Sequence, residues 1–445
     1  MLRSIARSPL LKRSIATQAA PKAEITELSN GLVVATEPNS NAGSASVGIV
    51  FGSGAAAENP YNNGVSHVLS SAFKSINGAA AAKEGFSLST AVERDFQSYI
   101  LDTEAANAGR ALDFLQSKLF APVSDGAFAS VRDATLKRVA AFEEQEHAER
   151  VLEHLHATAF QNTPLSLPKR GTVESIETLE KSDMESFAKS HFVASNAVVV
   201  GSGNISHEAL VKAVESQLSL AGGSKPVSKK VSSFLGSEIR LRDDTLPKAW
   251  ISIAAEGEPI SSPNYYVAKV AAQIFGSYVA SEPASNLQGV KLLDTVKEYH
   301  LADSFNHFSL SYKDAGLWGF STEISNIHQI DDLMHFALKE WNRLSVSITE
   351  TEVARGKALL KLNLATAASS NAAAATALGA QTLATGSKLA LTEVFAKIDA
   401  ITAKDVKKWA NERLWDQDIA IAGTGQIEGL LDYMRMRNDM SMMRW

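Results

Sequence analysis

The segment Gly64-Val65-Ser66-His67-Val68-Leu69-Ser70-Ser71-Ala72-Phe73-Lys74 carries the strongest clue to both the fold and the chemistry of this chain. Its apolar spacing favours a helix over roughly residues 63–76, after a strand over residues 46–51. Positions 67 and 71 of such a helix share one face, and position 70 lies beside them. Two imidazoles and a carboxylate at these positions would hold a zinc ion and activate its bound water.

That arrangement is the H-x-x-E-H pattern of inverted zinc peptidases, of which this chain retains only the first residue. His67 is followed by Ser70 and Ser71, whose hydroxyl groups are too short and too weakly basic to replace a general base or a second imidazole. We therefore predict a degenerate metal position at His67, Ser70 and Ser71, with no catalytic residue, no cofactor-binding residue and no metal. We expect His67 to be a hydrogen-bonded helix histidine rather than a residual ligand.

The composition is that of a soluble globular protein. The chain has 445 residues, of which 45% are hydrophobic and 21% charged, and suits two domains of roughly 200 residues each. The absence of cysteine excludes disulfides, thiolate zinc sites and iron–sulfur ligation. A formal net charge of −6 provides no basic surplus for binding nucleic acid, and no uncharged apolar run of ~18 residues predicts a membrane span.

Residues 1–23 have the make-up of a mitochondrial transit peptide. The segment contains serines, apolar residues on one helical side and no acidic residue before Glu24. Its basic residues are Arg3, Arg7, Lys12, Arg13 and Lys22. The sequence Arg13-Ser14-Ile15 resembles a matrix-protease site, which would place cleavage near residue 15. The alternative is a disordered basic tail.

Two distant parts of the sequence repeat each other. Residues 195–205 match residues 417–427, with an offset of 222 positions from Gly201 to Gly423, and the match extends upstream as far as Ile176 and Ile398. Each copy predicts a helix, a buried strand, a Gly-x-Gly turn and another helix. A duplicated α/β domain of about 210 residues explains this repeat. We predict an N-terminal domain over residues 24–220, a linker over 221–236 and a C-terminal domain over 237–445.

Further local expectations follow from turn chemistry and periodicity. Asn30-Gly31 predicts a hairpin, and residues 125–160 predict one long helix with an ion pair between Glu146 and Arg150. In the second half a strand over residues 250–254 precedes a helix over 265–274 that contains no His or Glu, so a metal site was only ever possible in the first half.

Three other features have simpler interpretations. His154 and His156 are expected to pack or to form a surface hydrogen bond, and the alanine-rich residues 365–375 favour a small-residue helix or helix–loop at the surface. The methionine-rich residues 430–445 suit either a contact surface or a tail packed on its own domain.

Taken together, these residues resemble the mitochondrial processing peptidase family from about residue 24 to the C-terminus. The matching segments are residues 51–54, 62–67, 93–95, 154–165, 311–319 and 432–437.

Departures from the family pattern indicate whether this chain resembles the active or the inactive members. Active members add a glutamate as third zinc ligand, and the matching region here offers Glu143, Glu144, Glu146 and Glu149. With His67, one of these would still supply only two protein ligands where a catalytic zinc needs three.

Two further segments differ from the active enzyme. The peptide-binding edge strand of active members reads Leu-Asn-Ala, whereas this chain has Leu88-Ser89-Thr90. Residues 276–300 lack the glycine-rich loop of the substrate-recognising alpha subunit, since only Gly276 and Gly289 occur there.

The resemblance is closest to the core proteins of the ubiquinol–cytochrome c reductase (bc1) complex. It implies an α+β fold of two homologous α/β domains, each a mixed sheet packed by helices. It also implies a non-catalytic core subunit without cofactors, peripheral on the matrix side of the inner mitochondrial membrane. The implied partners are a second core protein, cytochrome b, cytochrome c1 and the Rieske subunit, with no nucleic acid. The alternatives are a beta-type subunit of a zinc processing peptidase, or a presequence-binding partner with an acidic surface.

Overall fold

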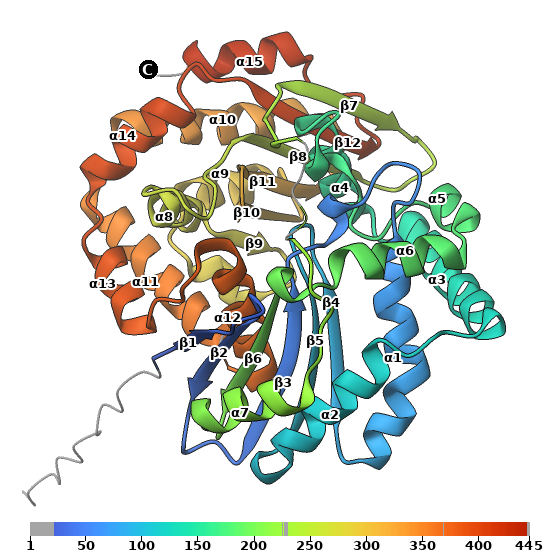
Figure 1. Cartoon of the computed structure of the whole chain (residues 1–445). Helices are drawn as coiled ribbons and strands as arrows, with labels where there is room; N and C mark the ends of the chain where they lie inside the picture. Colours follow the sequence, from blue (N-terminus) through green and yellow to red (C-terminus); the bar gives the residue numbers. More distant parts are fainter. Residues whose placement is uncertain (1–21, 225, 227–229, 368, 443–445) are drawn as a thin grey trace, which may run out of the picture.

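The structure, a computed structural model, describes residues 22–442 apart from 225, 227–229 and 368. Most of the predicted transit peptide therefore lies outside the described residues. The described chain forms two α/β halves that lie against each other, one coloured blue to green and the other yellow to red (Figure 1). This arrangement confirms the predicted α+β fold of two mixed sheets packed by helices.

Over the described residues, the first half contains a six-stranded sheet. Its order is β1 (Glu24–Glu27), β2 (Val33–Pro38), β6 (Ala197–Gly203), β3 (Ser44–Phe51), β5 (Gln97–Glu104) and β4 (Ser87–Val92). β2 and β6 run parallel and the other neighbours antiparallel. β1 and β2 form the predicted hairpin, in which Gly31 adopts the positive φ of 80° that favours glycine.

The second half repeats this topology in its own six-stranded sheet, again counted over the described residues. The order is β7 (Ser237–Arg242), β12 (Ile419–Gly425), β8 (Ala249–Glu256), β11 (Gly316–Ile324), β10 (Ser304–Ser311) and β9 (Ser277–Val279). β7 and β12 are parallel, as β2 and β6 are, and the remaining neighbours are antiparallel.

The repeat found in the sequence is therefore a structural duplication. Strand β6 maps onto β12 at both ends with the offset of 222 positions, and so does α6 (Lys181–His191) onto α14 (Ala403–Arg413). Helices α7 (His207–Gln217) and α15 (Tyr433–Met442) follow the two strands in turn.

One face of the first sheet is covered by helices from the same half. These are α1 (Val65–Lys83), α2 (Ala108–Leu119) and α7. Their apolar side chains meet alternate strand residues such as Ile49 and Leu101, and Phe51 stacks on Phe192 at 4.0 Å between ring centroids. Helices α3 (Asp125–Gln145), α5 (Val173–Thr178) and α6 surround the far side of α1.

The second sheet has an equivalent covering from its own half. Helices α8 (Tyr265–Phe275), α10 (Ile330–Val346) and α14 form its core together with α9 (Lys291–Tyr299), α11 (Glu350–Ala367), α13 (Leu391–Asp399) and α15. Trp318 lies at the centre of this core. The centroid of its ring is 5.0 Å from that of Trp341 and 5.3 Å from that of Trp409.

The other face of each sheet is covered by a helix from the opposite half. Helix α4 (His147–Ala159) leaves the first half and packs on β12, β8 and β7, where Leu155 is fully buried against second-half residues. Helix α12 (Asn371–Thr385) leaves the second half and packs on β6, β3 and β2, where Ala375 and Leu378 are fully buried. The two halves thus exchange helices reciprocally.

Polar contacts reinforce this exchange. His156 on α4 is buried, its Nε2 lies 2.7 Å from the hydroxyl of Tyr312, and its Nδ1 lies 2.7 Å from the carbonyl of Leu152. The backbone N–H of Lys313 donates to the Asp95 carboxylate at 2.8 Å. His156 therefore follows the expectation of packing, because its ring is buried between the halves and its hydrogen bonds are not at the surface.

Several local predictions need correction. The expected long helix is broken at Glu146, whose φ of −98° and ψ of 59° separate α3 from α4. The predicted Glu146–Arg150 ion pair is not formed, because the Arg150 guanidinium donates to the carbonyl of Glu143 at 2.9 Å. The alanine-rich segment spans the end of α11 and the start of α12, where Ser370 caps the helix, and Ala375 is buried against the first sheet rather than exposed.

The methionine-rich C-terminus follows the second of its two interpretations over the part that is described. Met436 and Met440 are fully buried in the second-half core, whereas Met434 is 62% exposed. Within the described ranges, none of the helices combines the length and the apolar character needed to cross a bilayer.

Gly379 lets α12 approach the first sheet closely, since a Cβ added there would lie 2.8 Å from the Cβ of Val50. We expect Gly379→Val to reduce the free energy of unfolding by about 1–3 kcal/mol, because overpacking pushes the helix off the sheet. The same change at exposed Ala377 should cost about 0.5 kcal/mol through helix propensity alone. Urea denaturation of both variants checks this, and equal losses would contradict it.

Candidate functional site

The helix that carries the degenerate pattern is fixed at its start by a buried carboxylate. Glu58 accepts hydrogen bonds from the backbone N–H groups of Gly64 at 2.7 Å and Ser66 at 2.8 Å, and from the side-chain amide of Asn63 at 2.8 Å. A carboxylate suits this end because the first N–H groups of a helix lack partners and carry partial positive charge. Burial nevertheless raises the pKa of Glu58 to about 7, and the hydrogen bonds oppose that rise.

Two glycines bring a second segment against the same helix end. Gly64 has a φ of 92° and Gly171 a φ of 78°, and a Cβ on Gly171 would lie 2.7 Å from the Cα of Gly64. Larger residues would separate the two backbones. This contact holds Lys169 and Arg170, which precede Gly171, beside the first turns of α1.

The three sequence-predicted positions do meet in one pocket of about 550 Å³. His67, Ser70 and Ser71 line it from α1, together with residues 90–92 of the edge strand β4. The remaining lining includes Lys74, Arg138, Lys169 and Arg170. Its position between a helix and an edge strand corresponds to the peptide site that the family resemblance implied.

Positive charge dominates the surroundings of His67. Burial, together with the smaller effect of the charges of Arg138, Arg170 and Lys169, lowers its pKa to about 4. The imidazole is therefore neutral near pH 7. The expected hydrogen bond of His67 is not formed with any other residue in the described part of the chain.

The candidate third ligands lie away from the pocket. None of Glu143, Glu144, Glu146 and Glu149 is among its lining residues, and Glu149 pairs with Arg170 at 2.9 Å. Across the described residues, no cluster of three or more His, Asp or Glu side chains is placed to hold a metal ion. The pocket also offers no carboxylate that could act as a general base.

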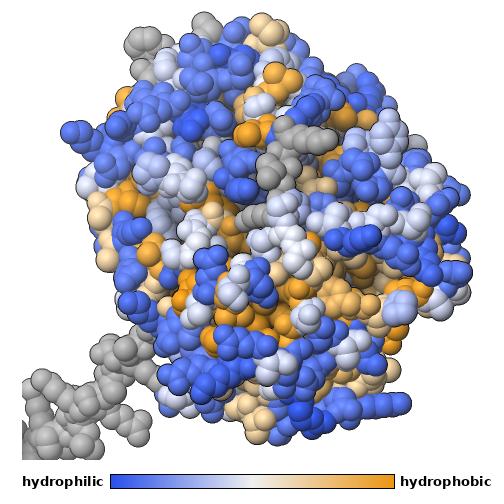
Figure 2. Space-filling view, viewed as in Figure 1, coloured by the Kyte–Doolittle hydropathy of each residue, from blue (hydrophilic) through white to orange (hydrophobic). Residues whose placement is uncertain are grey.

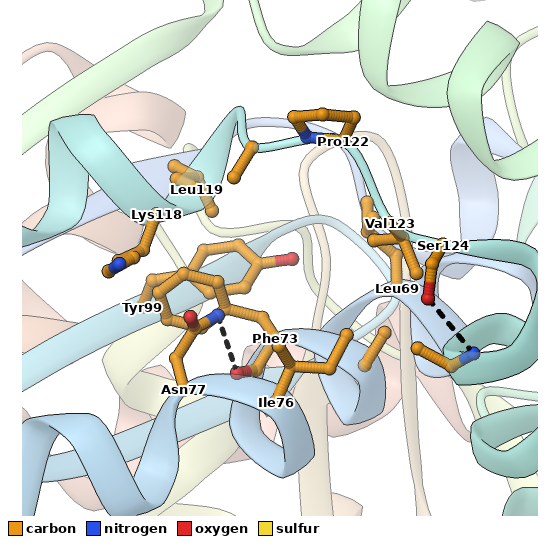
Figure 3. A pocket seen from close by; sticks show the side chains of 13 residues that line it. Leu69, Phe73, Ile76, Asn77, Tyr99, Lys118, Leu119, Pro122, Val123 and Ser124 are labelled. Atoms are coloured by element: carbon orange, nitrogen blue, oxygen red, sulfur yellow. Dashed lines mark hydrogen bonds between the residues drawn. The ribbon is translucent and has the colours of Figure 1, made fainter.

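A second pocket, of about 220 Å³, lies elsewhere along α1 and is mainly apolar. Figure 3 shows Leu69, Phe73, Ile76 and Asn77 projecting from this helix toward Tyr99 and toward the segment that ends at Ser124. Two of its polar groups are already engaged: Asn77 donates to the carbonyl of Phe73, and Ser124 accepts from the N–H of Ala127. Burial raises the pKa of the Tyr99 phenol, which therefore stays protonated near pH 7.

Sequence reasoning missed the basic residues of the first pocket and the role of Glu58. Arg138, Lys169 and Arg170 come from segments far from His67 in the sequence, so no local pattern joins them. Glu58 had one usable signal: an acidic residue shortly before a helix start can satisfy its free N–H groups.

The raised pKa of Glu58 predicts a pH effect on stability. Between pH 4.5, the ordinary pKa of a glutamate, and about pH 7, the Glu58 carboxyl stays protonated in the folded protein but is ionised in the unfolded chain. The protonated Glu58 side chain therefore contributes fully to stability below pH 4.5. As the pH rises to 7 this contribution is lost, and the free energy of unfolding falls by on the order of 3 kcal/mol.

We expect the free-energy difference between wild type and Glu58→Gln to fall over this pH range in denaturation experiments. Glu104→Gln, at an exposed position, should show no such trend. A difference that grows with pH would mean that the hydrogen bonds outweigh burial.

Comparisons with known proteins agree with this geometry. A family model described as "Insulinase (Peptidase family M16)" matches residues 33–173, and one described as "Peptidase M16 inactive domain" matches residues 178–360. Cytochrome b-c1 complex subunit 1, mitochondrial, from Saccharomyces cerevisiae is 62% identical over 100% of both chains. Mitochondrial-processing peptidase subunit beta from Lentinula edodes is 36% identical over 100% of this chain and 99% of that protein.

A solved structure gives the same result. A chain of "Complex III2 from Candida albicans, Inz-5 bound" superposes with a TM-score of 0.88 and 41% identity, over 94% of this chain and 100% of that chain. The chain therefore belongs to peptidase family M16, and within that family it is a close homologue of the mitochondrial cytochrome b-c1 complex subunit 1.

Proposed function

We propose that this chain is a non-catalytic core subunit of the mitochondrial ubiquinol–cytochrome c reductase complex. The observation that carries the proposal is 62% identity, over the full length of both chains, with a protein named cytochrome b-c1 complex subunit 1. The chain would pair with a homologous second core protein. Together they would support the cytochrome b, cytochrome c1 and Rieske subunits, which carry electrons from ubiquinol to cytochrome c.

The chemistry of the pocket supports a role without hydrolysis. Peptide hydrolysis by this family's mechanism requires three protein ligands on zinc and a base beside its bound water. The pocket provides His67, three serines and basic residues. We propose that no catalytic, cofactor-binding or metal-binding residue operates at His67, Ser70 and Ser71.

Surface properties support a partner role. Figure 2 shows hydrophobic residues gathered below the middle of one face, surrounded by hydrophilic ones. Large apolar side chains also project into solvent, with Tyr61 91% and Leu287 86% exposed. Permanent subunit interfaces commonly bury more than ~2,000 Å², and exposed apolar groups of this kind favour such contacts.

The proposed location is the matrix side of the inner mitochondrial membrane, with the chain peripheral to the membrane subunits. The basic, acid-poor residues 1–23 support import as a transit peptide cleaved near residue 15. The mature chain would then comprise domains over residues 24–220 and 237–445, joined by a linker over 221–236.

The alternative is a beta-type subunit of a zinc processing peptidase. It is favoured by 36% identity with a mitochondrial-processing peptidase subunit beta. The lower identity and the two serines make it the weaker candidate.

Purification through a tag on this chain tests the assembly. In mild detergent we expect haem-containing membrane proteins to be recovered in a fixed ratio to the chain, detected by absorbance spectra and by mass spectrometry. An untagged strain is the control. Recovery of a single soluble partner without haem would overturn the proposal.

A metal and activity assay tests the alternative separately. With excess zinc, the purified chain should retain well under one zinc per molecule in elemental analysis, and His67→Ala should not change that amount. Together with any soluble partner it should not cleave presequence peptides. Stoichiometric zinc lost in His67→Ala, or chelator-sensitive cleavage, would establish the peptidase instead.

A further inference from the structure

We propose that the pocket at His67, Ser70 and Ser71 is an anion site that takes a phosphate group, carried either by a small soluble molecule or by a lipid headgroup. The inference goes beyond the scaffold function and does not depend on it. It rests on the charge, the free hydrogen-bond donors and the size of the pocket.

The cations that line the pocket come from three segments of the chain. Lys74 lies on α1, Arg138 on α3, and Lys169 and Arg170 in the segment held by Gly171. No acidic residue is among the lining residues. The folding of separate segments, rather than one basic stretch of sequence, therefore produces the positive charge.

Only half of this charge is balanced by carboxylates. Lys169 pairs with Glu93 at 3.2 Å and Arg170 with Glu149 at 2.9 Å. Over the described residues, Lys74 and Arg138 have no carboxylate within ion-pair distance. Two positive charges remain, which matches a phosphomonoester, whose charge is about −1.5 to −2 at pH 7.

Neutral donors complete the lining. Ser70, Ser71, Ser75 and Thr90 also line the pocket, and their hydroxyl groups make no hydrogen bond to another described residue. Arg138 is anchored along its own helix, with Nη2 donating to the Thr135 hydroxyl at 3.1 Å and Nε to the Ala134 carbonyl at 3.3 Å. Phosphate oxygens accept hydrogen bonds from both hydroxyl and guanidinium groups.

The size favours a small anion over a peptide. A volume of about 550 Å³ lies within the range typical of small-molecule sites. The same charges repel basic amphipathic peptides, because like charges brought together without counterions raise the free energy. Ser70 and Ser71, which cannot support zinc chemistry, are thus hydrogen-bond donors in a pocket that favours an anion over a basic peptide.

Titration calorimetry on the full chain tests the site with inorganic phosphate and glycerol 3-phosphate as probes. We expect the double variant Lys74→Gln/Arg138→Gln to bind both about tenfold or more weakly, since it removes two charged donors. The matched control Lys83→Gln/Lys137→Gln removes two exposed charges from the same helices outside the pocket, and its affinity should stay within about twofold. Equal thermal unfolding midpoints would establish that both variants fold.

A second arm separates the two sources of phosphate. Phosphatidylcholine vesicles with added phosphatidic acid are sedimented with each variant. Binding lost only in the pocket variant assigns a lipid headgroup, and no vesicle binding alongside phosphate binding assigns a soluble compound. Absence of phosphate binding, equal weakening in both double variants, or tighter binding of an acidic peptide such as hexaglutamate would each overturn the proposal.

Discussion

The reciprocal packing of α4 and α12 is the constraint on which the rest of the structure depends. Each central strand is apolar on both faces, as Ile49 and Val50 on β3 illustrate, so each sheet needs helices on both sides. Each half supplies only one of these layers itself. Removing either exchanged helix would expose the face of a buried sheet, and apolar burial is the largest favourable contribution to folding. The two halves are therefore one cooperative unit despite their separate cores.

The pocket keeps the arrangement of helix and edge strand that the family resemblance implied, although two residues of the zinc-binding pattern are replaced. The position of α1 depends on Glu58, on the contact between Gly64 and Gly171, and on apolar packing, none of which involves the serines at positions 70 and 71. The second half has a related device at the same distance before its helix. There Glu258 accepts from the side chains of Trp409 and Arg413 rather than from backbone N–H groups. A buried carboxylate thus precedes the corresponding helix in each half, and its hydrogen-bond partners differ between the halves.

Local patterns predicted what is local. The offset between Gly201 and Gly423 gave the duplicated strands and helices, and Asn30-Gly31 gave the hairpin. The destination of the alanine-rich helix could not be predicted, because small residues give no amphipathic signal and the meaning of Gly379 depends on Val50, far away in the sequence. The basic lining of the pocket was missed for the same reason: its members become neighbours only after folding.

The position of α12 in the chain sets the order in which the protein can mature. The first sheet has all its strands once Gly203 is present, but the helix that covers its inner face ends at Thr385. When the polypeptide emerges amino end first from the ribosome, or from an import channel, that face stays uncovered until α12 has also emerged. Such a surface invites aggregation and is what chaperones bind. Completion of the N-terminal half thus requires most of the C-terminal half to have emerged first.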